Sequence, residues 1–224
     1  MTRIVLVRHG QASWHAEDYD VLTDTGHAQA LAVGAELRAR GIRPELALSG
    51  TLRRQRDTLA GMVAGAGETW AGVRQGVDAR WDELDGDDII AVNAPEHSTM
   101  TGALRDAPAA FDELFRFAMG RWIRGEGEYR ESCAQFTARV QEAAADLAER
   151  LGPDGTAVVA TSGGVCNALT SIALGGGPDT WRRLFGTFRN TSITQLGVGP
   201  RGLRLISLGE VSHLERAPHL FTDR

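Results

Sequence analysis

The sequence predicts an α/β protein with a three-layer α/β/α architecture, a mostly parallel central sheet and a helical insertion. The first observation is the run IVLV at residues 4–7, which is apolar throughout and lacks the alternation of a strand with one wet face. The second is the run TAVVAT at residues 156–161, which also leads into a short turn and a helix. Strands buried on both faces need helices on both sides of the sheet. We therefore expect a single domain over residues 1–224 with an insertion at about 85–130.

Helices and strands alternate along the first half of the chain. LTDTGHAQALAVGAELRARG predicts a helix that starts after Thr23 or Thr25, either of which can cap it, and ends near Gly41. PELALSG indicates a short strand that ends at Ser49, and TLRRQRDTLAGMVAGAG then predicts a second helix. A third strand is expected around residues 73–77.

The second half of the chain repeats the strand-to-helix pattern. A long amphipathic helix is predicted over about residues 132–151, ahead of the second apolar strand. Ligands bind at the carboxyl edge of open α/β sheets, so the junctions at residues 8–9 and 162–163 should face the same edge. TSITQLGV and LRLISLGEV predict a closing pair of strands with a turn at residues 199–202.

The composition excludes several classes of function. All 24 basic residues are arginine, so neither a Schiff-base lysine nor a Walker A phosphate loop can form. A net charge of -5 argues against a general nucleic-acid binder. Cys133 and Cys166 lie in unrelated segments, which gives neither a disulfide framework nor a metal cluster. The apolar runs are too short to span a bilayer or to form a signal peptide, so we expect a cytoplasmic protein with no membrane partner.

Basic and acidic side chains follow the predicted strands at this sheet edge. Arg8 and His9 come directly after the first strand, Arg54 lies in the first turn of the second helix, and Glu83 follows the third strand. Arginines at a helix N-terminus are unfavourable unless an anion neutralises them. Two guanidinium groups and the helix amides at Gly163 suit a doubly charged tetrahedral anion, most simply phosphate. A neutral imidazole beside phosphate can act as nucleophile, and a carboxyl group can protonate the leaving oxygen.

Six segments occur in one order over nearly the whole chain: LVRHGQAS, LTDTGHAQA, LSGTLRRQRDT, RWDELDG, VVATSGGV and NTSITQL. In these segments the sequence resembles the histidine phosphatase superfamily, the phosphoglycerate-mutase-like proteins. The resemblance implies that His9 is phosphorylated, that Arg8 and Arg54 bind the phosphoryl group, and that Glu83 is the proton donor. It also implies a small phosphorylated substrate and no metal or other cofactor. Further expected substrate contacts are Ser13, Ser162 and Gly163.

The sequence departs from the family pattern at one position near the site. The family's usual Ser-His-Gly-Gly carries a second histidine, and Ser162 stands at that place. A serine hydroxyl can donate to a phosphoryl oxygen but has no positive charge, and losing one such donor costs on the order of 100 to 1000-fold in rate. His15 and His97 are the two histidines considered for a compensating role. RES at the end of the insertion matches part of a family Gly-Glu-Ser segment, although Ser132 is equally suited to cap the next helix.

The leading hypothesis is a metal-independent phosphatase that hydrolyses a small phosphorylated metabolite through a phosphohistidine on His9, slowed by Ser162. A phosphoglycerate-type mutase is the alternative within the same chemistry. A non-catalytic phospho-ligand sensor or scaffold is the alternative from a different class. A third hypothesis makes Ser162 the nucleophile, but ATSGG lacks the first glycine of the usual G-x-S-x-G motif. The substrate and the oligomeric state stay open, with a homodimer as one option.

Overall fold

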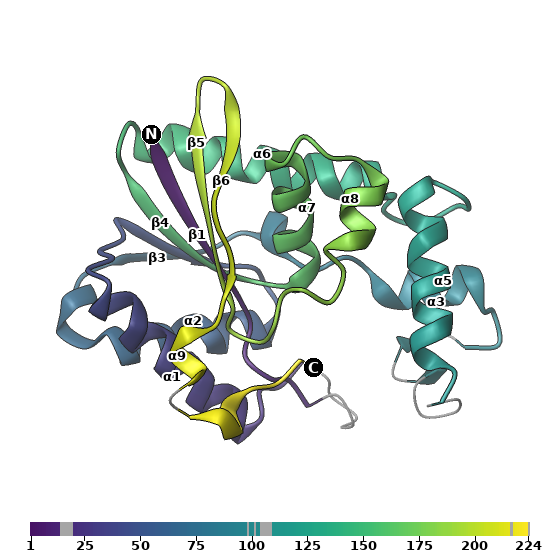
Figure 1. Cartoon of the computed structure of the whole chain (residues 1–224), viewed down its shortest axis with the longest axis horizontal. Coiled ribbons are helices and arrows are strands. Elements are labelled where there is room, and N and C mark those ends of the chain that lie inside the picture. Colours follow the sequence, from purple (N-terminus) through teal and green to yellow (C-terminus); the bar gives the residue numbers. More distant parts are fainter. Residues whose placement is uncertain (14–19, 98, 101, 104–108, 216, 224) are drawn as a thin grey trace.

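A mixed six-stranded sheet forms the centre of the protein in the computed structural model, which describes residues 1–224 apart from 14–19, 98, 101, 104–108, 216 and 224 (Figure 1). The strands are β1 (Thr2–Arg8), β2 (Leu46–Ser49), β3 (Arg74–Val77), β4 (Thr156–Thr161), β5 (Ile193–Gly199) and β6 (Gly202–Glu210). Their order is β3-β2-β4-β1-β5-β6. The first four are parallel to one another, and β5 and β6 are antiparallel to their neighbours. The sheet is therefore mostly parallel, as predicted.

Helices cover both faces of this sheet. The described helices are α1 (Asp24–Ala39), α2 (Arg53–Ala66), α3 (Gly86–Asn93), α5 (Phe111–Arg124), α6 (Cys133–Leu151), α7 (Gly163–Ala173), α8 (Pro178–Arg183) and α9 (Ser212–Glu215). Short 3-10 helices span Gly67–Trp70, Ala79–Trp81 and Pro218–Leu220. Helices α1 and α2 lie on one face and α6 and α7 on the other, whereas α3 and α5 lie beside the sheet (Figure 1).

The side chains of β1 alternate between two separate cores. Ile4 and Leu6 belong to the cluster on the α6 and α7 side, together with Phe136 of α6. Val5 and Val7 point to the other side and pack in the cluster that contains residues of α1 and α2. All four β1 side chains have no exposed surface, so the prediction of a strand buried on both faces is confirmed.

Strands β1 and β4 are neighbours, and their ends coincide. Their parallel register pairs Arg8 with Thr161, so the residues that follow both strands lie at the same edge of the sheet. This confirms the sequence-based expectation for the two strand-to-helix junctions. The predicted closing pair is also present, since β5 and β6 form an antiparallel hairpin closed at Gly199 and Gly202.

The region predicted as an insertion shares the main hydrophobic core, and Trp122 is one of the large side chains that join it to that core. Trp122 of α5 is 1% exposed, and its ring meets Phe136 at 5.8 Å and Trp181 at 5.9 Å, both edge-on. Phe136 lies in α6 and Trp181 in α8, so α5 is joined to two helices of the main layers. The division into one domain with an insertion at 85–130 stays a prediction.

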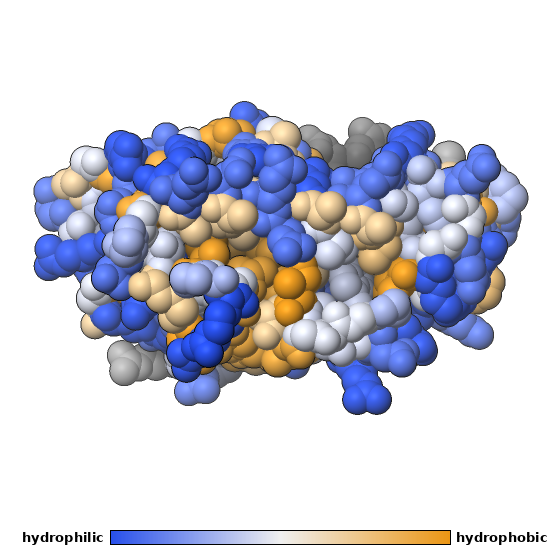
Figure 2. Space-filling view, turned by 90° about the horizontal axis from the view of Figure 1, so that it is seen from above, coloured by the Kyte–Doolittle hydropathy of each residue, from blue (hydrophilic) through white to orange (hydrophobic). Residues whose placement is uncertain are grey.

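Hydrophilic residues cover most of the face shown in Figure 2, and apolar residues gather near its middle. The apolar residues are bordered by hydrophilic residues on this face. Within the described ranges, no helix combines the length and the apolar character required to cross a bilayer.

Candidate active site

A cleft of about 1490 Å³ opens at the carboxyl edge of β1 and β4. Five side chains or glycines that the sequence predicts for the site line it together: Arg8, His9, Arg54, Glu83 and Gly163. They come from the end of β1, the start of α2, the segment after Ala79–Trp81 and the start of α7. The sheet topology thus joins groups that are up to 155 residues apart in the chain, from residue 8 to residue 163.

His9 is held in a form suited to nucleophilic attack. Its side chain is buried, and Nδ1 lies 2.8 Å from the carbonyl oxygen of Gly10, which can only accept. Nδ1 therefore carries the proton, and Nε2 keeps its lone pair. Burial first, and then the charges of Arg54 and Arg8, hold the pKa of His9 well below its ordinary value. The imidazole is accordingly neutral at neutral pH.

The backbone around His9 is fixed by hydrogen bonds from two distant parts of the chain and by close packing against a third. The Gly10 amide donates to Thr58 Oγ1 at 3.0 Å, and Asn190 Nδ2 donates to the His9 carbonyl at 3.2 Å. A Cβ on Gly10 would lie 2.5 Å from the carbonyl oxygen of Gly26 in α1. Only glycine permits this approach, which explains why Arg-His is followed by glycine.

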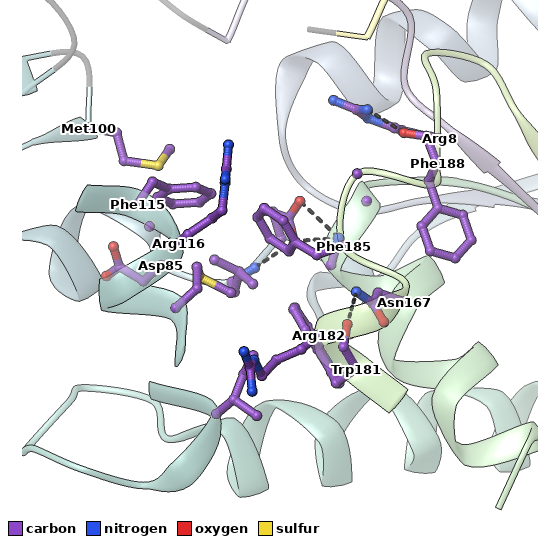
Figure 3. Close-up of a pocket in the computed structure, with 18 of the residues that line it drawn as sticks. Arg8, Asp85, Met100, Phe115, Arg116, Asn167, Trp181, Arg182, Phe185 and Phe188 are labelled. Carbon is purple, nitrogen blue, oxygen red and sulfur yellow. Dashed lines mark hydrogen bonds between the residues drawn. The ribbon is translucent and has the colours of Figure 1, made fainter. Parts of the chain in front are cut away.

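Arg8 has one guanidinium nitrogen committed to the backbone and another without a partner. Nη1 donates to the carbonyls of Phe188 and Asp223, the latter at 3.0 Å (Figure 3). Nε is buried and has no hydrogen-bond partner among the described residues. It lies 3.7 Å from where a Cβ on Gly163 would stand, at the N-terminus of α7. A buried donor of this kind beside helix amides is suited to an anion.

Arg54 binds an anionic side chain of the protein itself. The side chain is 9% exposed, and Nη1 pairs with Asp20 Oδ1 at 2.8 Å. Asp20 Oδ2 also accepts the backbone N–H of Arg53 at 2.7 Å. The anion that the arginine-rich start of α2 requires is supplied here by the Asp20 carboxylate, whereas the sequence pointed to phosphate.

Glu83 rests against the N-terminus of α7. Its carboxylate accepts the Gly164 amide at 3.1 and 3.2 Å and the Leu84 amide at 3.0 Å. A Cβ on Gly164 would lie only 2.1 Å from Glu83 Oε1, so glycine is needed for this contact. The second glycine of SGG thus brings the carboxyl group to the wall of the cleft that contains His9.

The structure does not bring either of the two predicted serine contacts into the lining of the cleft. Ser162 is fully buried, and its hydroxyl accepts a hydrogen bond from Gln55 Nε2 at 2.8 Å. The Ser13 amide donates to the Val21 carbonyl at 2.8 Å. Neither serine is among the described residues that line the cleft, and their contact with a phosphoryl group stays a prediction.

Two histidines, His15 and His97, were predicted as possible substitutes for the family's second histidine. His15 lies outside the described residues. His97 follows α3, and its amide donates to the Ala94 carbonyl at 2.8 Å. His97 is not among the described residues lining the cleft, and its compensating role stays a prediction.

Sequence reasoning overlooked four residues that position the site. Thr58 and Asn190 stand inside two of the quoted segments, so the motif match contained a signal for them. Gln55 also lies in such a segment, but its partner, the hydroxyl of Ser162, is known only from the fold. No sequence pattern predicts the contact of Asp20 with Arg54, because the two residues are 34 positions apart and meet only in the folded chain.

The cysteines do not contribute a second nucleophile. Burial raises the pKa of Cys166 to about 12, so its thiol is neutral at physiological pH. Burial likewise raises the pKa of Cys133. Across the described part of the chain, no three His, Cys, Asp or Glu side chains are grouped so that they could hold a metal ion.

The motif order, the sheet and the cleft agree with one family. The family described as Histidine phosphatase superfamily (branch 1) matches residues 4–211 of the chain. The chain belongs to the histidine phosphatase superfamily. The resemblance noted in the sequence is thereby confirmed, together with the α/β fold that it implied.

Solved structures of histidine phosphatase fold are similar over nearly the whole chain. A mycobacterial glucosyl-3-phosphoglycerate phosphatase in complex with VO3 is 27% identical, with a TM-score of 0.66, and the match covers 93% of this chain and 99% of that one. YhfR from Bacillus stearothermophilus has a TM-score of 0.70 at 20% identity, covering 96% of this chain and 100% of that one. At that identity the second match shows the fold alone.

Curated relatives match a shorter part of the chain. A 2,3-bisphosphoglycerate-dependent phosphoglycerate mutase from Mesorhizobium japonicum is 38% identical over 72 residues, which cover 30% of this chain and 35% of that protein. The mutase of the same name from Novosphingobium aromaticivorans is 36% identical over 89 residues, or 37% and 38% of the two chains. The chain thus spans little more than a third of the length of these relatives.

Proposed function

We propose that this histidine phosphatase superfamily member is a metal-independent phosphatase that hydrolyses a small phosphate monoester through a phosphohistidine on His9. The observation that carries the proposal is the state of His9: a buried, neutral imidazole with its Nδ1 proton bound to Gly10 and its Nε2 lone pair available. Arg8, Arg54 and Glu83 line the same cleft, so charge binding and proton transfer are available beside the nucleophile.

In the first step, Nε2 of His9 attacks phosphorus while the bond to the ester oxygen breaks. The guanidinium groups of Arg8 and Arg54 and the amides at Gly163 stabilise the charge on the phosphoryl oxygens. The Glu83 carboxyl group gives its proton to the leaving alkoxide, so the alcohol departs neutral. The product of this step is His9 phosphorylated on Nε2 with Glu83 ionised.

In the second step, the Glu83 carboxylate takes a proton from a water molecule as that water attacks the phosphohistidine. The bond between phosphorus and Nε2 breaks, inorganic phosphate leaves, and both His9 and Glu83 return to their starting forms. One carboxyl group thus serves as acid and then as base.

Ser162 supports the site through its position in this scheme. Its hydroxyl accepts from Gln55 just before α7, and in this scheme the same hydroxyl donates its proton to a phosphoryl oxygen. Because Ser162 carries no charge, turnover is expected to be slower than with the family's second histidine.

The phosphatase proposal is supported by the glucosyl-3-phosphoglycerate phosphatase, whose structure matches 93% of the chain at 27% identity. The mutase alternative is supported by sequence matches such as that from Mesorhizobium japonicum, which is 38% identical over 30% of the chain. A mutase must also return the phosphoryl group to a second hydroxyl before water reaches the phosphohistidine. Incubating the enzyme with an ester and a diol, and measuring phosphate release against transfer, distinguishes the two.

The decisive experiment measures hydrolysis of phenyl phosphate without added metal, for the native protein and for His9→Ala. We expect the native protein to release phosphate, and His9→Ala to lose at least about 1000-fold, because no other group can form the covalent intermediate. Capturing a phosphohistidine by rapid acid-free quenching and mass spectrometry would locate the phosphoryl group.

Ser162→Ala serves as the companion variant. Gln55 keeps its second bond, to the Trp81 carbonyl at 3.1 Å, so the fold should tolerate the change. Survival of activity in Ser162→Ala, with loss in His9→Ala, supports the phosphohistidine route, and the reverse pattern would establish a serine nucleophile. A native protein that binds phosphate but releases none from any ester between pH 5 and 8 would be a sensor instead.

A further inference from the structure

The cleft extends well beyond the space that a phosphoryl group needs. From Arg8 and His9 it continues between α5 on one side and α8 with the following loop on the other (Figure 3). Its volume of about 1490 Å³ exceeds the roughly 300–1,000 Å³ that is usual for small-molecule pockets. The part beyond the phosphoryl site is therefore where the alcohol portion of an ester would lie.

Aromatic rings form a continuous wall in this outer part. Phe111 stacks on Phe115 within α5 at 5.7 Å, and Phe115 is in direct contact with Phe185, in the loop after α8, at 5.6 Å between ring centroids. Phe185 in turn stacks on Trp181 of α8 at 6.3 Å. Trp181 rests on the buried Trp122, which anchors the row of rings to the core.

The rings at the centre of this wall are accessible to a ligand. Phe185 is 38% exposed and Phe115 is partly buried, although both side chains are large and apolar. Figure 3 shows both rings in the space between α5 and the loop after α8. Exposed rings inside a concave site, and not on an open surface, are typical of ligand pockets.

Charged groups in the outer part nearly cancel. Four acidic residues line it, and three arginines lie among them: Asp85, Asp87, Asp112 and Asp179, with Arg116, Arg182 and Arg183. Two of these acids have a partner within the protein: Asp87 accepts a hydrogen bond from the Met100 amide at 2.7 Å, and Asp179 lies 3.7 Å from Arg182. The acidic residues also outnumber the arginines by one. The outer part therefore offers no net positive charge for a second phosphate or carboxylate.

We propose that the outer cleft binds the leaving group of a phosphate monoester whose alcohol carries an apolar ring system and no second charged group. The inference rests on the proposed phosphatase function, and it names the substrate class for that site. The phosphoryl group binds at Arg8, Arg54 and Gly163, and the ring system packs against Phe115 and Phe185. A bisphosphate or a phosphorylated carboxylate gains nothing comparable in this part of the cleft.

The test compares naphthylmethyl phosphate with ethyl phosphate, whose leaving groups are both alkoxides. We expect kcat/KM for the native protein to be at least about 30-fold higher with naphthylmethyl phosphate, because burial of its aromatic rings in the outer cleft stabilises the bound ester. Equal kcat/KM for the two esters, or a preference for phosphoglycerate over naphthylmethyl phosphate, would overturn the inference.

Three variants locate the preference. Phe115→Ala and Phe185→Ala should each lower kcat/KM for naphthylmethyl phosphate about tenfold and leave ethyl phosphate within about twofold. Phe117→Ala is the matched control, since Phe117 lies on the same helix, is 56% exposed and is not among the described residues lining the cleft. Circular dichroism checks that each variant folds. Equal effects of all three variants on both esters would place the preference elsewhere and refute the assignment.

Calorimetric binding of naphthylmethyl phosphonate and methyl phosphonate separates this inference from the phosphatase proposal, because phosphonates bind without turnover. Tighter binding of the naphthyl compound, lost in Phe115→Ala, supports the cleft assignment even if no ester is hydrolysed. Conversely, hydrolysis that depends on His9, combined with equal binding of the two phosphonates, would leave the phosphatase proposal standing and refute the assignment of the outer cleft.

Discussion

At the residue scale, the site combines a neutral nucleophile with strongly charged neighbours. His9 stays neutral because it is buried between Arg54 and Arg8, which disfavour a further positive charge. The same arginines are the groups that would bind a phosphoryl dianion. Charge that suppresses protonation of the imidazole therefore also attracts the substrate that the imidazole attacks.

Asp20 occupies the guanidinium group of Arg54, to which the proposed function assigns a phosphoryl oxygen. Its carboxylate holds the guanidinium group at 2.8 Å and the Arg53 amide at 2.7 Å, as a phosphoryl oxygen would. We expect Asp20→Asn to bind inorganic phosphate several-fold more tightly, up to about tenfold, because the amide still accepts from the helix but carries no charge. Competitive inhibition by phosphate, or calorimetry, measures the change.

Asp57→Asn is the control for this prediction. Asp57 also pairs with an arginine of α2, Arg53 at 3.5 Å, and its side chain is 33% exposed against 32% for Asp20. Asp57 is not among the described residues that line the cleft, so its replacement should leave phosphate affinity unchanged. Unchanged or weaker phosphate binding in Asp20→Asn would contradict the competition.

At the scale of the elements, the N-termini of α7 and α6 have different roles: the first contributes to the cleft and the second stabilises its own helix. The start of α7 lies in the cleft and binds Glu83 through the Gly164 amide. The start of α6 carries a capping box, in which Ser132 Oγ accepts the Gln135 amide and Gln135 Oε1 accepts the Ser132 amide at 2.8 Å. Ser132 is therefore the N-cap of α6, the structural alternative to the site role that the RES segment suggested.

Removing that cap should affect stability and not catalysis. We expect Ser132→Ala to lower the free energy of unfolding by about 1 kcal/mol, because the first turn of α6 loses its side-chain acceptor. Urea denaturation measures the loss of stability. The rate of phosphate release from phenyl phosphate should stay within about twofold of the rate of the native protein. Ser132→Thr should retain most of the stability, whereas a large loss of activity in either variant would point back to a site role.

At the scale of the whole molecule, the segment after β6 ties distant parts of the site together. Gln29 of α1 donates to the Leu220 carbonyl at 2.6 Å, and Thr222 Oγ1 donates to Asn190 at 2.9 Å. His213 is buried in the same region and is hydrogen-bonded to Thr191 at 3.1 Å. The residues that hold the backbone of Arg8 and His9 thus depend on this segment.

The buried histidines make the stability of the whole fold depend on pH. Burial is the main cause that lowers the pKa of His213 to about 4; the charge of Arg40 lowers it further, and the carboxylates of Glu36 and Glu210 oppose the shift. An unfolded chain binds protons at these histidines near pH 6.5, so between about 6.5 and 4 it holds more protons than the folded one. Stability should be full above pH 6.5 and fall as the pH drops through that window.

His213 alone should account for a loss on the order of 3 kcal/mol by the bottom of that window. Urea midpoints measured from pH 7 to pH 5 follow the loss, and His213→Gln should flatten the dependence. The exposed His219 of the same segment provides the control, because His219→Gln should leave the slope as it is. A native protein with no fall in stability over this range would contradict the prediction.

The sequence by itself was sufficient to predict the apolar runs that form the sheet, the helix over 132–151 and the grouping of Arg8, His9, Arg54 and Glu83 in one place. These depend on local patterns: unbroken apolar runs, caps, and a motif in which neighbouring residues carry the information. The structure places these four residues in one cleft because the edge of a parallel sheet collects the residues that follow its strands.

Only the tertiary structure decided which groups surround that motif. The contact between Asp20 and Arg54, the bond from Gln55 to the buried Ser162 and the aromatic wall of Phe115 and Phe185 all join residues distant in the chain. Each depends on how helices and loops pack, and many sequences satisfy the same packing, so no local pattern encodes it. The residues proposed to react with the phosphoryl group are thus recognisable in short sequence motifs. The shape of the cleft around the rest of the substrate depends on the tertiary fold.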